Sequence, residues 1–206
     1  RLQSERYYPG EMISHLYMMM GTHLLMGTKE FLELVRFMNE DIKTYPKLEG
    51  KKIFWVHLLP FYQETLQKYL NCNPDYQIIA SDIIIDSMEK LDPEHPFHAL
   101  AKKIIRNLYN GSYSHKADMV ANLADMLKPD AVIQFCHWGC KQSSGGSLLL
   151  KERMQETVLT GETAMTARLR RVWKLSWKCW IRIRASGRFH ESALLNYFLT
   201  VCSDLG

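Results

Sequence analysis

The chain lacks any hydrophobic run long enough to cross a bilayer, and residues 1–10 lack the apolar core of a signal peptide. Its cysteines are too few, too scattered and odd in number for a disulfide framework. These features argue against membrane-spanning and disulfide-rich secreted proteins, so we expect reduced thiols in a cytoplasmic protein. A start at arginine rather than methionine predicts a fragment. The five cysteines are Cys72, Cys136, Cys140, Cys179 and Cys202.

Apolar and charged residues are not scarce. Hydrophobic residues make up 47% and charged residues 23% of the 206 residues, which is typical of a globular chain that can bury a core. The net charge of +4 is unevenly distributed, because the stretch from Arg168 to His190 is rich in Arg and Lys and contains no acid. Taken at face value, the tryptophans in this basic stretch would suggest a membrane or nucleic-acid contact. We expect neither partner, for a reason given below.

Hydrophobic periodicity predicts an α/β fold. Apolar residues recur every three or four positions over residues 11–43, and Gly21 and Gly27 predict a division into two helices. Short apolar runs then alternate with helical patterns, which indicates an open parallel sheet with flanking helices, preceded by a helical segment. Strands are predicted at 52–57, 76–80 and 131–135, and helices at 61–70, 96–108, 115–127 and from 148.

The most informative stretch runs from Phe135 to Ser147, directly after the third predicted strand. Ligands of parallel sheets gather at the carboxyl ends of strands, and thiolates are soft metal ligands. Cys136 and Cys140 therefore fit a metal site, although their spacing is not that of a zinc ribbon. Two alternatives remain open from the residues alone: a pair of buried thiols beside a Gly-rich turn, or a redox or nucleophilic cysteine.

The segment from Val132 to Gly146 resembles the third cysteine region of the 2-hydroxyacyl-CoA dehydratase and benzoyl-CoA reductase family, and the resemblance extends over residues 11–156. Members often carry a strand, a few residues and then Cys followed by Lys or Asp, which falls on Cys140-Lys141. The resemblance thus implies that Cys140 is an iron–sulfur ligand, with Cys136 the second candidate. It also implies that 46–160 is the flavodoxin-like C-terminal half of a subunit and that 1–45 is a helical connecting segment.

Further expectations follow from this resemblance. A [4Fe-4S] cluster lies between two flavodoxin-like halves, and its other cysteine ligands come from the N-terminal half. Two dehydratase subunits pair, and an ATP-dependent iron–sulfur activator injects one electron. Water is then eliminated from a 2-hydroxyacyl-CoA through a ketyl radical, giving an enoyl-CoA. The alternatives are a benzoyl-CoA reductase-type subunit and a non-catalytic iron–sulfur electron-transfer protein.

Three more residues are candidates for substrate contact. His57 follows the first predicted strand and either touches substrate or is a structural histidine. Gln142 and Ser143 either donate hydrogen bonds to a cluster sulfide or a thioester, or form the turn before the next helix. No role is assigned to Lys116, and no catalytic residue is named.

The tail from residue 161 departs from the family pattern, which continues with acidic Gly-Asp and Glu-rich stretches. Back-translated and read one nucleotide earlier, allowed codons for the run from Gly161 spell Gly-Asp-Cys-Tyr-Asp-Ser-Thr-Ser-Ser-Glu-Gly-Leu-Glu-Thr-Lys, which is the expected ending. We therefore interpret 161–206 as an aberrant basic tail produced by a frame shift near Thr157 to Gly161. Nucleotide sequencing across this point is expected to reveal an insertion or deletion relative to a close relative, and an intact frame would refute the interpretation.

Overall fold

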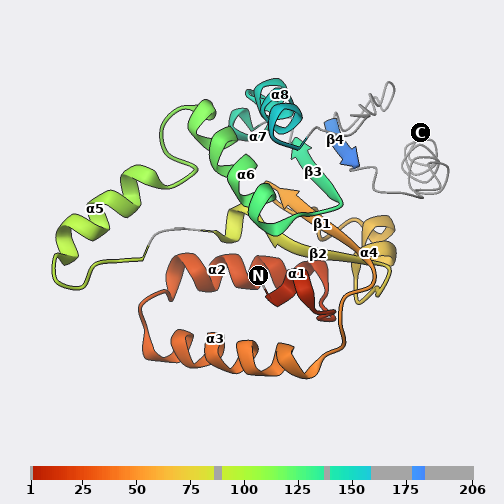
Figure 1. Cartoon of the computed structure of the whole chain (residues 1–206), viewed down its shortest axis with the longest axis horizontal. Helices are drawn as coiled ribbons and strands as arrows, with labels where there is room; N and C mark the ends of the chain where they lie inside the picture. Colours follow the sequence, from red (N-terminus) through yellow and green to blue (C-terminus); the bar gives the residue numbers. More distant parts are fainter. Residues whose placement is uncertain (1, 86–89, 137–139, 159–177, 184–206) are drawn as a thin grey trace.

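The computed structural model describes residues 2–85, 90–136 and 140–158, together with the backbone of 178–183 (Figure 1). The elements within these ranges are α1 (Leu2–Glu5), α2 (Met12–Leu24), α3 (Lys29–Asp41), η1 (Ile42–Thr44), β1 (Lys51–Val56), α4 (Glu64–Leu70), β2 (Tyr76–Ser81), η2 (Asp82–Ile84), α5 (Pro96–Arg106), α6 (Tyr113–Leu127), β3 (Ala131–Cys136), α7 (Lys141–Ser144), α8 (Ser147–Val158) and β4 (Lys178–Ile183).

The strands form one open sheet in the order β2-β1-β3-β4. Strand β1 pairs in parallel with both β2 and β3, which confirms the predicted parallel α/β sheet. Strand β4 pairs antiparallel with β3. It lies in the predicted aberrant tail, so the edge of the sheet next to β3 differs from the all-parallel expectation.

Side chains of β1 alternate between the two faces of the sheet, as the period of two in a strand requires. Phe54 and Val56 pack in the cluster formed with α6 and α8. Ile53 and Trp55 pack in a second cluster on the opposite face, with Met12 of α2 among its members. Figure 1 shows α6 and α8 on one side of the sheet and α1, α2 and α3 on the other. Both faces are therefore buried, which explains why the strands are predominantly apolar.

One carboxylate connects the beginnings of β1 and β3. The Asp130 Oδ2 atom accepts a hydrogen bond of 2.9 Å from the Lys52 backbone N–H, and the Asp130 N–H donates to the Lys52 carbonyl, also at 2.9 Å. Val56 is then paired with Gln134 at the other end of the two strands. The residues that follow β1 and β3 consequently emerge side by side at the carboxyl edge of the sheet.

Local capping defines two of the helices. The Thr28 hydroxyl accepts a hydrogen bond from the Phe31 N–H at the start of α3, and Ser112 does the same for His115 at the start of α6. The two helices predicted within residues 11–43 are confirmed as α2 and α3.

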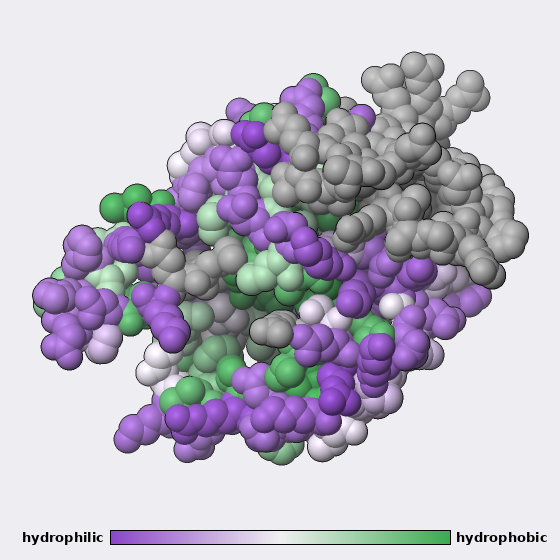
Figure 2. Space-filling model, viewed as in Figure 1, coloured by the Kyte–Doolittle hydropathy of each residue, from purple (hydrophilic) through white to green (hydrophobic). Residues whose placement is uncertain are grey.

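Helix α5 is present where the periodicity predicts it, but its apolar side is not packed against the described residues. Phe97 is 88% exposed and Ile105 is 73% exposed, whereas Ala99 is buried. Figure 1 shows α5 projecting from the body of the molecule, and Figure 2 shows hydrophobic surface there among hydrophilic residues. Among all described helices, none combines the length and the apolar character needed to span a membrane.

Candidate functional site

The site lies at the carboxyl edge of the parallel strands, beginning with His57 directly after β1. The backbone of His57 has φ 78°, a left-handed conformation that residues other than glycine rarely adopt. Its N–H donates a 2.6 Å hydrogen bond to the Asp82 Oδ1 atom. This charge-assisted bond stabilises the unusual backbone conformation.

Cys140 meets His57 at this edge. It is the N-cap residue of the short helix α7, and the residue is partly exposed. The Cys140 Sγ atom lies 3.7 Å from the His57 Nε2 atom, although the two residues are 83 positions apart in the sequence. Two of the residues singled out in the sequence are therefore brought into contact by the parallel pairing of β1 and β3.

Cys136 and Ser143 lie beneath this edge, inside the protein. Cys136 is 2% exposed, and its thiol donates to the Ser143 carbonyl over 3.2 Å. The Gln134 amide donates to the same carbonyl at 2.8 Å. The buried Ser143 hydroxyl donates to the Cys140 carbonyl at 3.0 Å. These bonds fix the turn that carries Cys140.

Gln142 lies on the outside of the same turn. Its side-chain amide donates to the Tyr109 carbonyl at 3.3 Å, and the residue is exposed. Of the five residues singled out in the sequence, Cys140, His57 and Gln142 are thus accessible at least in part, whereas Cys136 and Ser143 are buried.

Three residues that the sequence analysis did not select form a buried polar hub behind His57: Asp82, Lys116 and Tyr109. The fully buried Asp82 carboxylate accepts a 2.9 Å hydrogen bond from the Tyr109 hydroxyl through Oδ2. The Lys116 Nζ atom lies 3.2 Å from the same oxygen and 4.0 Å from the centre of the Tyr109 ring. Lys116 is only 1% exposed, so its ammonium group and the Asp82 carboxylate neutralise each other inside the protein.

Two signals in the sequence point to this hub. Asp82 immediately follows the second strand, where ligands and functional side chains of parallel sheets gather. Lys116 lies four residues before Val120, on the buried stripe of α6, where an unpaired lysine would be costly. A lysine on an apolar stripe indicates a buried acidic partner.

Burial and neighbouring negative charge keep both tyrosines of the hub region protonated. The pKa of Tyr109 is raised strongly, first by burial and then by the charge of Asp82 and the hydrogen bond to it. The pKa of Tyr113 is also raised by burial, and its hydroxyl accepts a 2.9 Å bond from the Gln134 amide. The Tyr109 hydroxyl is therefore a fixed hydrogen-bond donor to Asp82.

The side chains at this edge could supply part of a metal site but not a complete one. Among the side chains that the structure describes, no group of three His, Cys, Asp or Glu residues is arranged to hold a metal ion. Cys140 is partly exposed and offers one cysteine sulfur, the kind of ligand that iron–sulfur clusters require. The residues present therefore fit one corner of a cluster.

A family model described as 2-hydroxyglutaryl-CoA dehydratase, D-component, matches residues 2–167. The chain belongs to this dehydratase D-component family. The match includes every residue of the site above and extends past residue 161, where the sequence pattern places the start of the aberrant tail. A search of curated proteins and a search of solved structures found no match to the chain. Membership of this family indicates that the chain is a dehydratase-type subunit, and its α/β fold is consistent with this assignment.

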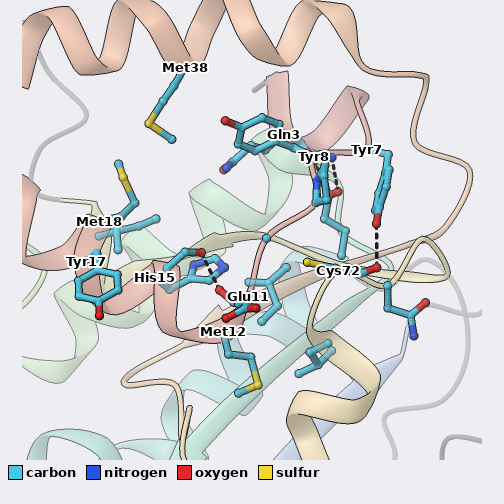
Figure 3. A pocket seen from close by; sticks show the side chains of 18 of the residues that line it. Gln3, Tyr7, Tyr8, Glu11, Met12, His15, Tyr17, Met18, Met38 and Cys72 are labelled. Carbon is cyan, nitrogen blue, oxygen red and sulfur yellow. Dashed lines mark hydrogen bonds between the residues drawn. The ribbon is translucent and has the colours of Figure 1, made fainter.

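A separate cavity of about 370 Å³ lies between α2, the N-terminal segment and β2 (Figure 3). Tyr8, Met12, His15 and Met38 contribute to its lining, and none of the D-component site residues described above does. Burial lowers the pKa of His15 from 6.5 to about 4, so this imidazole is neutral in the folded protein at neutral pH.

From the lowered pKa of His15 we predict that the folded protein loses stability in acid. The unfolded chain binds a proton at His15 below about pH 6.5, whereas the folded chain resists protonation until about pH 4. The contribution of His15 to the free energy of unfolding is therefore expected to be fully present above pH 6.5 and to decrease as the pH is lowered from 6.5 towards 4. Urea denaturation across this range measures it. His15→Gln should flatten the slope, and the exposed control His98→Gln should keep it. An equal slope in parent and His15→Gln contradicts the assignment.

Proposed function

We propose that the chain is an iron–sulfur subunit of a 2-hydroxyacyl-CoA dehydratase that removes water from a 2-hydroxyacyl-CoA to give an enoyl-CoA after ATP-dependent activation. The observation that carries the proposal is the position of Cys140: a partly exposed residue at the carboxyl edge of the parallel strands, with its sulfur 3.7 Å from the His57 Nε2 atom, in a chain of the D-component family. In this proposal Cys140 supplies one ligand of a [4Fe-4S] cluster, and the remaining ligands come from elsewhere in the assembled enzyme. When bound, the cluster supplies one-electron chemistry.

The chain's own residues hold the ligand and orient the substrate. Buried Ser143 and Cys136 fix the turn that carries Cys140 through their bonds to its backbone. Gln142 is exposed and His57 is partly exposed beside that turn, and we assign both to substrate contact. Cys136 remains the second candidate for a ligand, but its thiol is engaged with the Ser143 carbonyl.

Cysteine replacement tests the ligand assignment. Cys140→Ala is expected to lose most of the bound iron and sulfide, because a missing thiolate leaves one iron without its protein ligand. Iron and sulfide are measured, with EPR, after anaerobic purification together with the partner subunit. Cys72→Ala is the matched control, because Cys72 is free and exposed.

The same measurement on Cys136→Ala separates the two candidate ligands. Iron retained in Cys136→Ala and lost in Cys140→Ala supports the proposal. Full iron content in Cys140→Ala would falsify it. Dehydration of a 2-hydroxyacyl-CoA by the complete system, with activator and ATP, distinguishes the dehydratase from a ring-reducing relative, and the absence of any acyl-CoA turnover favours an electron carrier.

The acyl-CoA substrate is supported by a basic cavity of about 440 Å³ between α5 and α6. Phosphate groups of coenzyme A need Arg and Lys donors of this kind. Asp92 is the one acid among its described lining residues, and its Oδ2 atom lies 3.0 Å from the His95 Nδ1 atom. The basic lining residues are Lys90, His98, Lys102, Lys103, Arg106 and His115.

Charge reversal tests the basic cavity. Lys102→Glu with Arg106→Glu is expected to weaken coenzyme A binding at least about tenfold, because one lost charge-assisted bond is worth roughly 1.5 kcal/mol. Isothermal titration calorimetry at low salt measures the Kd. Lys29→Glu with Lys43→Glu makes the same charge change as a control, because both lysines are exposed, the first at the start of α3 and the second in η1. Equal weakening by both double variants would point to net charge and not to this cavity.

The second dehydratase subunit and the ATP-hydrolysing activator belong to the same proposal. The D-component family implies a partner subunit within a dehydratase complex. The exposed apolar residues of α5, Phe97, Ile104 and Ile105, support such a contact, because exposed hydrophobic patches typically mark protein interfaces.

A further inference from the structure

The buried Asp82 carboxylate connects four separate segments at the carboxyl edge of the sheet. It follows β2, and it accepts hydrogen bonds from the His57 N–H at 2.6 Å and from the Tyr109 hydroxyl at 2.9 Å. The Lys116 Nζ atom of α6 is 3.2 Å away. None of these residues has a role in the proposed function except His57, so the purpose of two fully buried charges next to the site needs an explanation.

The geometry of His57 depends on this carboxylate. A histidine at φ 78° is strained by roughly 1 kcal/mol or more, and such strain persists only where surrounding contacts enforce it. The short bond from its N–H to Asp82 is the contact that does so. This backbone conformation places the His57 imidazole so that its Nε2 atom lies 3.7 Å from the Cys140 sulfur.

Lys116 and Tyr109 in turn fix the carboxylate. A buried ammonium group is tolerated only when it is paired, and Asp82 is its partner at 3.2 Å. The Tyr109 ring lies under the same ammonium group at 4.0 Å, which adds a cation–π contact. With the Tyr109 hydroxyl on Oδ2 and the His57 N–H on Oδ1, both oxygens of Asp82 are held.

We propose that Asp82, Lys116 and Tyr109 form a positioning unit that holds the His57 imidazole against the Cys140 sulfur, so that His57 donates a hydrogen bond to that sulfur. This inference rests on the proposed function only where it concerns the cluster. Hydrogen bonds to a ligating sulfur raise the reduction potential of an iron–sulfur centre, because they stabilise the more negative, reduced form. In the cluster-free chain, the same contact with an imidazole makes a thiol more reactive.

The first experiment uses the cluster-loaded subunit with its partner. His57→Gln removes the imidazole, and Asp82→Asn with Lys116→Met removes both buried charges together, so that neither is left uncompensated. Both variants are expected to retain iron and to shift the reduction potential of the cluster in the negative direction, with altered EPR g-values. The control is Asp118→Asn with Arg153→Met, which removes the ion pair of 2.7 Å between α6 and α8. The control should leave the potential and the g-values unchanged.

The second experiment needs no cluster. In the full chain at fixed pH, the alkylation rate of Cys140 by iodoacetamide is read by peptide mass spectrometry, with the exposed Cys72 as internal reference. The rate at Cys140 is expected to fall about threefold or more in His57→Gln and in the paired Asp82/Lys116 variant, relative to Cys72. Tyr109→Phe, which keeps the ring under Lys116, should give a smaller fall in the same direction.

The outcomes separate this inference from the proposed function. Suppose that the parent protein retains iron, that Cys140→Ala loses it, and that the reduction potential of the paired Asp82/Lys116 variant is unchanged. This result overturns the positioning unit and leaves the ligand assignment intact. A parent without iron whose Cys140 alkylation still depends on Asp82 and His57 supports the positioning unit and overturns the ligand assignment. If the paired variant loses its circular dichroism signal, Tyr109→Phe and His57→Gln decide, and unchanged Cys140 reactivity in both overturns the inference.

Discussion

The buried ion pair between Asp82 and Lys116 is the constraint on which the carboxyl edge of the sheet depends. Two charges taken out of water cost several kcal/mol each unless they meet each other in good geometry. Lys116 is on α6 and Asp82 follows β2, so α6 must pack across the sheet in one position for the pair to form. The Tyr109 segment and the end of β1 are drawn to the same carboxylate.

The sheet delivers the other half of the site. Alternation along β1 directs Phe54 and Val56 towards α6 and α8, and a slip of one residue would turn both to the opposite face. The register is therefore fixed by burial, and the bonds of Asp130 to Lys52 fix the strand beginnings. Because the register and the strand beginnings are fixed, His57 and the turn after β3 lie next to each other. The Cys140 sulfur is therefore close to the His57 imidazole.

Membership of the D-component family and the geometry of the edge are both consistent with the proposed shared cluster site. In the proposed function Cys140 supplies one ligand and needs others, and the described residues supply no third metal-binding side chain beside it. A rigid support behind His57 is consistent with such a shared site, because ligands contributed by separate segments must each be held in place before they meet. The exposed apolar side of α5 is a further sign of a surface that assembly would cover.

The sequence alone determined most of the elements and indicated where the candidate site lies. Short apolar runs predicted β1, β2 and β3, and apolar residues at every third or fourth position predicted most helices, since these patterns reflect which side chains must be buried. The strand followed by two cysteines and a Gly-rich turn located the Cys140 turn. Tertiary structure decided what surrounds it. Four features depend on how residues far apart in the chain come together. They are the antiparallel addition of β4, the burial of Cys136, the unpacked side of α5 and the hub of Asp82, Lys116 and Tyr109. A local pattern can indicate that Lys116 needs a buried acidic partner, but it does not identify that partner, because the free energy of a buried charge depends on which partner the fold brings to it.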